Sequence, residues 1–366
     1  MSYHFHHVIT DMLPSDTLKT LCKKTNVRFL HSIASNNKDI LNLLGRFPNI
    51  RKEMILDSGG YSLFGDQCKL FDINEHVLMR IEQRLNPDIM IGPDFPIYGK
   101  YEWSLKLTSF RTKLFHLITK NIDLKSKYYD AIQGELKVNG EYSLKERSHW
   151  LEEITKISGN RIYGYALAGL INSSLSELAY FGMQPWSIGC KNVHILGVGS
   201  IESLALFVYM GNHCYNNFSS DAKSYTIDAG VHLNMLNPKG VNEKPGSLTL
   251  LKTNYQKYEE KDTDCNCDIC KHYRKKYSTS VYGLAETNAE GDDAKIALLR
   301  AWVIGHSVCL VQNYLSELGG LVDNKTAYIS YLKEKGFDDV VEAISLVDRL
   351  VLDGKDSYAG NISLLK

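Results

Sequence analysis

The chain has 366 residues, with 42 Lys+Arg balanced by 42 Asp+Glu and a hydrophobic fraction of 44%. This composition is that of an ordinary globular protein with a buried core, and the neutral balance argues against coating nucleic acid by charge alone. Charges interrupt every apolar run of about 18 residues, so we expect no membrane span. The N-terminus lacks the apolar core of a signal peptide, and we expect a cytoplasmic protein.

Apolar segments of strand length alternate with amphipathic segments along most of the chain. The expected strands are Val27–Ile33, Met54–Leu56, Asp88–Ile91, Tyr128–Ile132, Ile162–Ala168, Val193–Leu196, Asn217–Ser220 and Ser247–Leu251. The expected helices are Asp72–Leu85 and Ser143–Ile154, which both open on capping-box patterns, and Ser200–Tyr209, Ala294–Leu318 and Ala327–Leu350. Repeated strand–helix units predict a parallel sheet with helical crossovers.

About eight such units close into a (β/α)8 barrel, which needs about 250 residues. The remaining residues fit an insertion around a cluster of cysteines. We therefore predict an α/β (β/α)8 TIM barrel formed by residues 1–255 and 311–366, with a zinc-binding subdomain at residues 256–310.

Polar and glycine residues collect where the predicted strands end. They are Asp57-Ser58-Gly59-Gly60, Asp94, Gln133-Gly134, Ala168-Gly169, Gly197-Val198-Gly199 and Asp221. Turns favour Gly and Asp, which explains any one of these clusters alone. In a barrel, however, all strand C-termini open onto one face, so together they predict a shared site.

Three carboxylates in this set carry the expected chemistry. Asp57 precedes Gly59-Gly60-Tyr61, where the glycines allow close approach of a ligand and Tyr61 offers a ring for stacking. Asp57 and Asp94 can divide acid–base work from ligand recognition, and Asp221 can attack an anomeric carbon.

The motif Cys265-x-Cys267-x2-Cys270 offers three thiolates within one loop, which suits tetrahedral zinc. His272 is too near in sequence to turn back to the same metal. We prefer His306, on a predicted helix, as the fourth ligand, with Cys309 one turn later as the alternative. A closed four-ligand shell predicts structural zinc and argues against a hydrolase with catalytic zinc.

The segment from Lys271 to Tyr277 interleaves basic and aromatic residues. Such a run can contact a phosphate backbone and stack on bases, or it can be a solvated helix face.

The ordered set of motifs resembles the tRNA-guanine transglycosylase superfamily, (β/α)8 enzymes with a zinc-binding insertion. The resemblance covers about residues 50 to 310. Its matching pieces are Asp57-Ser58-Gly59-Gly60-Tyr61, Asp94, Gln133-Gly134, Ala168-Gly169-Leu170, Leu196-Gly197-Val198-Gly199 and Cys265-x-Cys267-x2-Cys270.

The resemblance implies an exchange of guanine in a polynucleotide for a 7-deazaguanine. It implies that Asp221 is the nucleophile at C1′ and Asp57 the general acid/base, with Asp228 the alternative nucleophile because it also follows a short apolar run. Two displacements at one carbon retain its configuration.

The resemblance also implies the base-binding residues. Asp94 would recognise the guanine-like edge, Gln133 and the backbone N–H of Gly169 would bind the exocyclic oxygen, and Tyr61 would stack on the ring.

The sequence departs from the tRNA-modifying enzymes of the family at two places. At these places it is similar to the DNA-modifying, DpdA-type branch of phages and bacteria, which inserts preQ0 (7-cyano-7-deazaguanine). The segment Ala222-Lys223-Ser224-Tyr225-Thr226 replaces the family's Pro-Thr-Arg segment, which grips the anticodon loop. The stretch Leu170-Ile171-Asn172-Ser173-Ser174 lacks the glutamate that suits a cationic aminomethyl base. We therefore expect DNA and preQ0 as substrates.

Two alternatives stay open: the same exchange on tRNA, and a non-catalytic zinc-bearing subunit that binds nucleic acid. The sequence leaves undecided whether the chain is a monomer or a homodimer, and whether it acts in a bacterium or, if phage-encoded, in the host cytoplasm.

Overall fold

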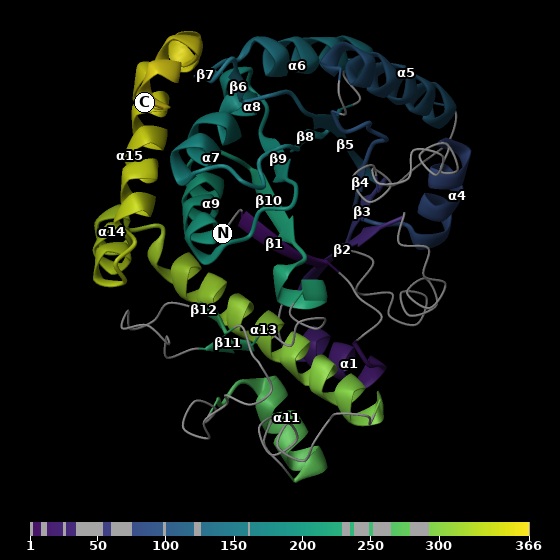
Figure 1. Cartoon of the computed structure of the whole chain (residues 1–366), viewed down its shortest axis with the longest axis vertical. Coiled ribbons are helices and arrows are strands. Elements are labelled where there is room, and N and C mark those ends of the chain that lie inside the picture. The colour runs from purple at the N-terminus through teal and green to yellow at the C-terminus, as the bar shows by residue number, and fades with distance from the viewer. Residues whose placement is uncertain are drawn as a thin grey trace.

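The computed structural model describes residues 3–8, 13–24, 27–33, 54–59, 75–97, 100–120, 126–159, 162–228, 235–237, 249–251, 265–278 and 293–365. Its centre is a closed parallel barrel in the strand order β1-β10-β9-β8-β5-β4-β3-β2 (Figure 1). The barrel strands are β1 Tyr3–Val8, β2 Arg28–Ser32, β3 Ile55–Asp57, β4 Ile89–Ile91, β5 Lys127–Ile132, β8 Gly164–Leu167, β9 Asn192–Ile195 and β10 Asn217–Ala222. This confirms the predicted (β/α)8 fold.

Alternation along the strands separates an inner from an outer set of side chains. The interior of the barrel contains a small apolar cluster of Leu30, Ile55, Ile89, Ile91, Tyr129 and Ala166. The side chains that alternate with these along the strands point outward and join the large apolar cluster between the barrel and its helices. Because Asp57 lies two residues after Ile55, its side chain belongs to the inner set.

The eighth barrel strand differs from the one expected. It is β1, which pairs with β10 and β2. The expected strand at Ser247–Leu251 is instead β12 (Thr249–Leu251), which pairs antiparallel with β11 (Met235–Asn237) outside the barrel. The three histidines of β1 concealed its alternation, in which Tyr3 and Phe5 face the helices.

Helices surround the barrel on its outside (Figure 1). The helices of the described residues are α1 Ser15–Lys24, α4 Glu75–Leu85, α5 Tyr101–Thr119, α6 Lys145–Ser158, α7 Leu175–Gly182, α8 Gln184–Ser187, α9 Ile201–His213, α11 Asp268–Tyr277, α13 Asp293–Leu321, α14 Lys325–Glu334 and α15 Asp338–Asp353. Of these, α11 packs on α1 and α13, and α14 packs on α13 and α15. The π-helix η3 (Ser224–Asp228) follows β10, a hairpin of β6 (Lys137–Val138) and β7 (Glu141–Tyr142) follows β5, and the 3-10 segment η5 (Lys355–Leu365) follows α15.

Two helix predictions were wrong in detail. The helix expected at Ala327–Leu350 is two helices, α14 and α15, because Gly336 between them has φ +71°. The capping box expected at Ser143 does not form: α6 begins after Leu144, and Glu146 accepts a hydrogen bond from the Glu135 N–H.

A complete capping box occurs instead at α7. The hydroxyl of Ser174 accepts from Glu177 N–H at 3.2 Å, and the Glu177 carboxylate accepts from Ser174 N–H at 2.6 Å. This bond pair stabilises the start of the helix that follows the β8 loop.

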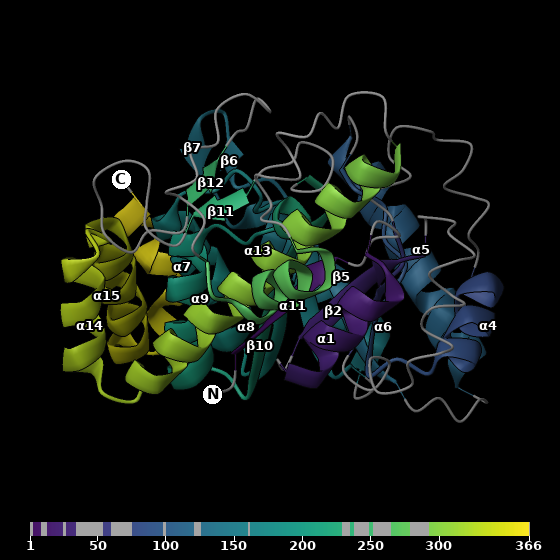
Figure 2. The ribbon, with the colours of Figure 1, turned by 90° about the horizontal axis from the view of Figure 1, so that it is seen from below.

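The long helix α13 packs against α1, α9 and α11, and the two views show α1, α11 and α13 side by side (Figures 1 and 2). The helix α13 is long and apolar enough to cross a membrane, but 67% of its most apolar segment is buried inside the protein. It therefore packs as a core helix. The expected domain boundary at residues 310/311 lies within this helix, and the division into two domains stays a prediction.

Candidate active site and metal centre

The residues expected at the barrel mouth come from five strands. Asp57 ends β3, Asp94 lies just beyond β4, Gln133 directly follows β5, Gly169 lies just beyond β8, and Asp221 is the second-to-last residue of β10. All five strands are parallel, so these residues gather at one end of the barrel. Asp94, Gln133 and Asp221 are each buried.

Asp57 has an electrostatic environment suited to proton transfer. Burial, together with the negative charges of Asp94 and Asp221, raises its pKa to about 7. The Gly59 N–H donates to Asp57 Oδ2 at 3.1 Å and partly opposes this shift. Near neutral pH Asp57 therefore populates both its acid and its base form.

Asp94 and Gln133 form one hydrogen-bonded unit. Gln133 Nε2 donates to Asp94 Oδ2 at 2.5 Å, and the Ser58 hydroxyl donates to Oδ1 at 3.4 Å. The Ile97 N–H donates to Gln133 Oε1 at 3.1 Å, which sets the orientation of the amide. Burial raises the pKa of Asp94, and the bond from Gln133 counteracts it.

Asp221 is held through one of its two oxygens. Both His194 Nε2 and the Gly197 N–H contact Oδ1 at 3.0 Å. Because a carboxylate oxygen accepts, Nε2 carries a proton, and Nδ1 on the other side of the ring lies 2.9 Å from the Ser219 hydroxyl oxygen. Among the residues that the structure describes, none donates a hydrogen bond to Oδ2.

His194 was not among the residues expected from the sequence. It is completely buried on β9, and register pairing of His194 with Ser219 on β10 brings it beside Asp221. The sequence feature that could have indicated a functional role for His194 was its position, as a polar residue, in a predicted apolar strand. Its function depends on which strand lies next to β9, which the sequence does not state.

Gly169 lies just after β8 in a conformation that favours glycine. Its φ is +76°, in the left-handed region. Within the described part of the chain, no group accepts a hydrogen bond from its N–H. The preceding carbonyl, that of Ala168, accepts from the Arg147 guanidinium at 3.1 Å.

Two expected residues fall outside this description. Tyr61 lies outside the described residues, and so does the side chain of Asp228, whose backbone ends η3.

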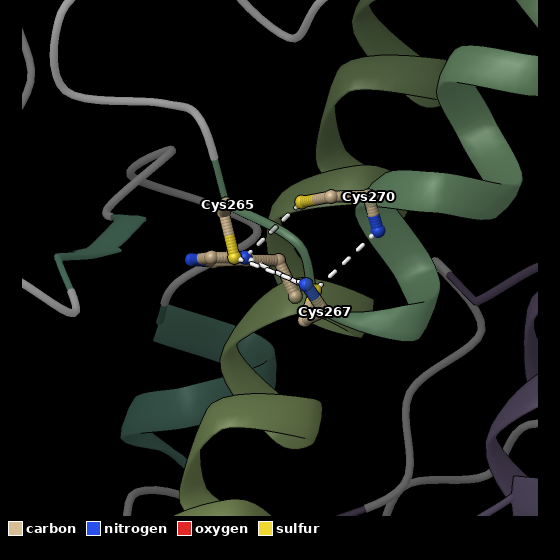
Figure 3. Close-up of side chains that lie close together, drawn as sticks. Cys265, Cys267 and Cys270 are labelled. Carbon is tan, nitrogen blue, oxygen red and sulfur yellow. Dashed lines mark hydrogen bonds between the residues drawn. The ribbon is translucent and has the colours of Figure 1, made fainter.

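The cysteine motif forms a buried group with His306. The ligand atoms of Cys265, Cys267, Cys270 and His306 all lie within 4.8 Å of one another, and Figure 3 shows the three cysteines turned toward one another. His306 Nδ1 lies 3.5 Å from Cys267 Sγ and 3.3 Å from Cys270 Sγ. Four soft or borderline donors in this arrangement can hold a tetrahedral metal ion.

The surroundings of this Cys3His group hold its ligands in place. Cys267 caps α11, because its sulfur accepts from the Cys270 N–H at 3.4 Å. Trp302 Nε1 donates to Cys270 Sγ at 3.3 Å, and Arg274 donates to the Cys265 carbonyl at 2.7 Å. The group thereby ties α11 to α13.

The basic segment Lys271–Tyr277 is not one uniform solvated face. Tyr273 is buried and stacks on Trp302 with ring centroids 5.0 Å apart. Lys276 pairs with Asp16 at 2.5 Å, and His272 lies 3.8 Å from the same carboxylate rather than at the metal group.

The fold and these two sites define the class of the protein: a (β/α)8 barrel with a carboxylate-bearing mouth and a separate Cys3His group. The family model described as "TGT: Queuine tRNA-ribosyltransferase" matches residues 10–289, about three quarters of the chain, and the chain belongs to this family.

A search of curated proteins gave no match. Among solved structures, the chain is similar to the X-ray crystal structure of the Paramecium bursaria Chlorella virus arginine decarboxylase, with 15% identity and a TM-score of 0.35. The match covers 66% of this chain and only 64% of that chain. This likeness is too distant to bear on activity.

Proposed function

We propose that this protein exchanges guanine in DNA for a 7-deazaguanine such as preQ0 through a covalent aspartyl–sugar intermediate. The observation that carries the proposal is the pairing of two unlike carboxylates at one mouth. Among the described residues Asp221 has hydrogen-bond donors at one of its two oxygens, whereas Asp57 has a pKa of about 7. The first suits a nucleophile and the second suits a proton carrier.

In the first displacement, Asp221 Oδ2 attacks C1′ of the target nucleotide and the bond from C1′ to the base nitrogen breaks. The bonding electrons leave with guanine, and neutral Asp57 donates its proton to the departing base. The sugar is then esterified to Asp221, and Oδ1 becomes the carbonyl oxygen of the ester. The target nucleotide must be flipped out of any stack to reach this position.

In the second displacement, ionised Asp57 removes a proton from the incoming base. The base nitrogen attacks C1′, the ester bond breaks, and Asp221 returns to a carboxylate. The donors from His194 and Gly197 at Oδ1 stabilise the negative charge that develops there, because they are already oriented toward it. Two inversions leave the configuration at C1′ unchanged.

The base would be recognised by groups on the β4, β5 and β8 sides of the mouth. Asp94 accepts from the N–H groups of a guanine-like edge, while Gln133 Nε2 and the Gly169 N–H donate to its exocyclic oxygen. Tyr61 would stack on the ring. A buried site whose polar groups are left unpaired by the wrong base discriminates strongly.

Two features support DNA and a neutral base. The segment after Asp221 carries no arginine, and its Tyr225 is buried, with the hydroxyl donating to the Gly199 carbonyl at 2.5 Å. Tyr225 therefore packs on the barrel, and the segment lacks the arginine with which the tRNA enzymes grip the anticodon loop. The loop after Gly169 has no acid to pair with a cationic base. Exchange on tRNA is the alternative.

The Cys3His group would hold structural zinc within the proposed subdomain at residues 256–310. The donors fit this ion, because three sulfurs and one imidazole nitrogen complete a tetrahedral shell. Bound zinc would supply rigidity between α11 and α13. The exchange chemistry itself is carried by the side chains of the mouth.

The test is incorporation of labelled preQ0 into matched DNA and tRNA substrates, with trapping of the covalent adduct on a denaturing gel. We expect incorporation into DNA and an adduct whose mapped peptide contains Asp221. Incorporation into tRNA alone would contradict the choice of DNA. The absence of both incorporation and adduct with either polymer would favour a non-catalytic nucleic-acid-binding subunit.

A further inference from the structure

Arg147 on α6 is a buried cation that the mechanism above does not use. Its side chain is 0% exposed, and in the described part of the chain no carboxylate contacts it. Burial lowers its pKa to about 10, so it stays charged at neutral pH. Burying an unpaired charge is costly, which makes the identity of its partners informative.

The partners of Arg147 are mainly backbone carbonyls of the two loops that follow β5 and β8. Its Nη1 donates to Gly134 O at 3.3 Å and to Ala168 O at 3.1 Å, and its Nε donates to Gln184 Oε1 at 3.4 Å. One nitrogen therefore joins the loop that carries Gln133 to the loop that carries Gly169.

The bond to Ala168 O determines the direction of the Gly169 N–H. The Ala168–Gly169 peptide is trans, so its carbonyl and its N–H point in opposite directions. With the carbonyl held toward α6, the N–H points away from α6. A cation on the carbonyl also polarises the peptide and strengthens its N–H as a donor.

The glycine at position 134 allows the guanidinium to reach this place. A Cβ on Gly134 would meet the Arg147 backbone nitrogen at 2.8 Å and its Cγ at 2.7 Å. Gly134 also has φ +119°, which disfavours other residues. The close approach of α6 to this loop is therefore built into the sequence.

We propose that Arg147 is a positioning residue that orients and strengthens the Gly169 N–H as donor to the exocyclic oxygen of the bound base, and so sets the preference for 6-oxopurines. This inference rests on the proposed function, because it assigns the base pocket to the same mouth. Arg147 itself touches neither base nor sugar.

The experiment compares guanine with 2-aminopurine, which lacks the exocyclic oxygen and the N1 proton. The readout is the change in this preference between wild type and variant, because the N1 difference is the same in both. Direct binding of each base is measured by calorimetry, and each is measured as a competitor in the exchange reaction. In Arg147→Met we expect the preference for guanine to fall about tenfold, as for the weakening of one charge-assisted hydrogen bond. Arg147→Lys keeps the charge and reaches one carbonyl, so it should retain part of the preference.

Phe181→Leu is the matched control, because the Phe181 ring lies 5.7 Å from the Arg147 guanidinium carbon yet holds neither loop carbonyl. It should lower stability and leave the preference unchanged. A guanine preference that is unchanged in both Arg147 variants overturns the inference, even if stability falls. A wild-type protein that binds neither base and exchanges none overturns the proposed function first.

Discussion

The barrel mouth and the Cys3His group both bury ionisable side chains, but in opposite electrostatic settings. At the mouth, Asp57 faces the like charges of Asp94 and Asp221, which raise its pKa. At the Cys3His group, the thiolates and His306 converge within 4.8 Å, where a cation can neutralise them. At the mouth, like charges face one another and make burial of charge unfavourable, whereas at the Cys3His group a bound cation would make the same burial favourable.

The largest expected effect is on base exchange and follows from a substitution at the barrel mouth. Asp221→Asn should lower base exchange by about 10³-fold or more and abolish the covalent adduct, because an amide is a poor nucleophile. The measurement is single-turnover exchange with a denaturing gel. Asp228→Asn is the control and should keep the adduct. An adduct that persists in Asp221→Asn and disappears in Asp228→Asn would reverse the assignment.

Metal removal should act on the other region. Cys267→Ser keeps an N-cap for α11, since serine caps well, and removes one metal ligand. We expect loss of bound zinc and destabilisation by about 3 kcal/mol or more, because metal binding is coupled to folding. Metal analysis and thermal unfolding check this. Cys309→Ser, outside the Cys3His group, should retain the metal, and equal metal loss in both variants would be inconsistent with the ligand set.

His194 provides an intermediate test at the mouth. His194→Phe leaves only the Gly197 N–H on Asp221 Oδ1, so kcat should fall about 10- to 100-fold with little change in KM. Steady-state exchange kinetics measure both constants. Ser219→Ala, which removes only the partner of the ring, should have a smaller effect. A His194→Phe variant with the wild-type kcat would remove His194 from the mechanism.

The smallest expected effect concerns stability and pH at Asp57. Its folded pKa of about 7 exceeds the ordinary value of 3.8, so the folded chain holds this proton more tightly than the unfolded chain. Stability therefore falls as pH rises between these values. Asp57→Asn should stabilise the protein by about 1–2 kcal/mol more at pH 8 than at pH 5, where part of the effect is already present because the unfolded carboxyl is ionised.

Chemical denaturation at the two pH values checks the Asp57 prediction, and Asp88→Asn, at a half-exposed surface pair with Lys127, is its control. Because proton donation to the leaving base needs neutral Asp57, exchange by the wild type should also slow above pH 7. Destabilisation of Asp57→Asn at pH 8 would show that this carboxylate is paired favourably rather than held against like charges.

Features encoded over short distances were predictable from the sequence. The spacing Cys265-x-Cys267-x2-Cys270 places three sulfurs in one loop before any fold is considered, and strand–helix alternation is sufficient for the barrel. The strand C-termini could be assigned to one face because all parallel barrels share that geometry. Local rules were less reliable where two hydrogen-bond patterns compete. The capping box predicted at Ser143 does not form, because the Glu146 carboxylate instead accepts from the Glu135 N–H.

The sequence by itself determined the barrel class, the cluster of three cysteines and the strand-end positions of Asp57, Asp94 and Gln133, because these depend on periodicity and spacing. Only the tertiary structure decided that β1 closes the barrel, that His194 lies beside Asp221, and that Arg147 joins two loop carbonyls. Those contacts arise from which strands and helices become neighbours, and neighbours distant in sequence leave no local periodic signal.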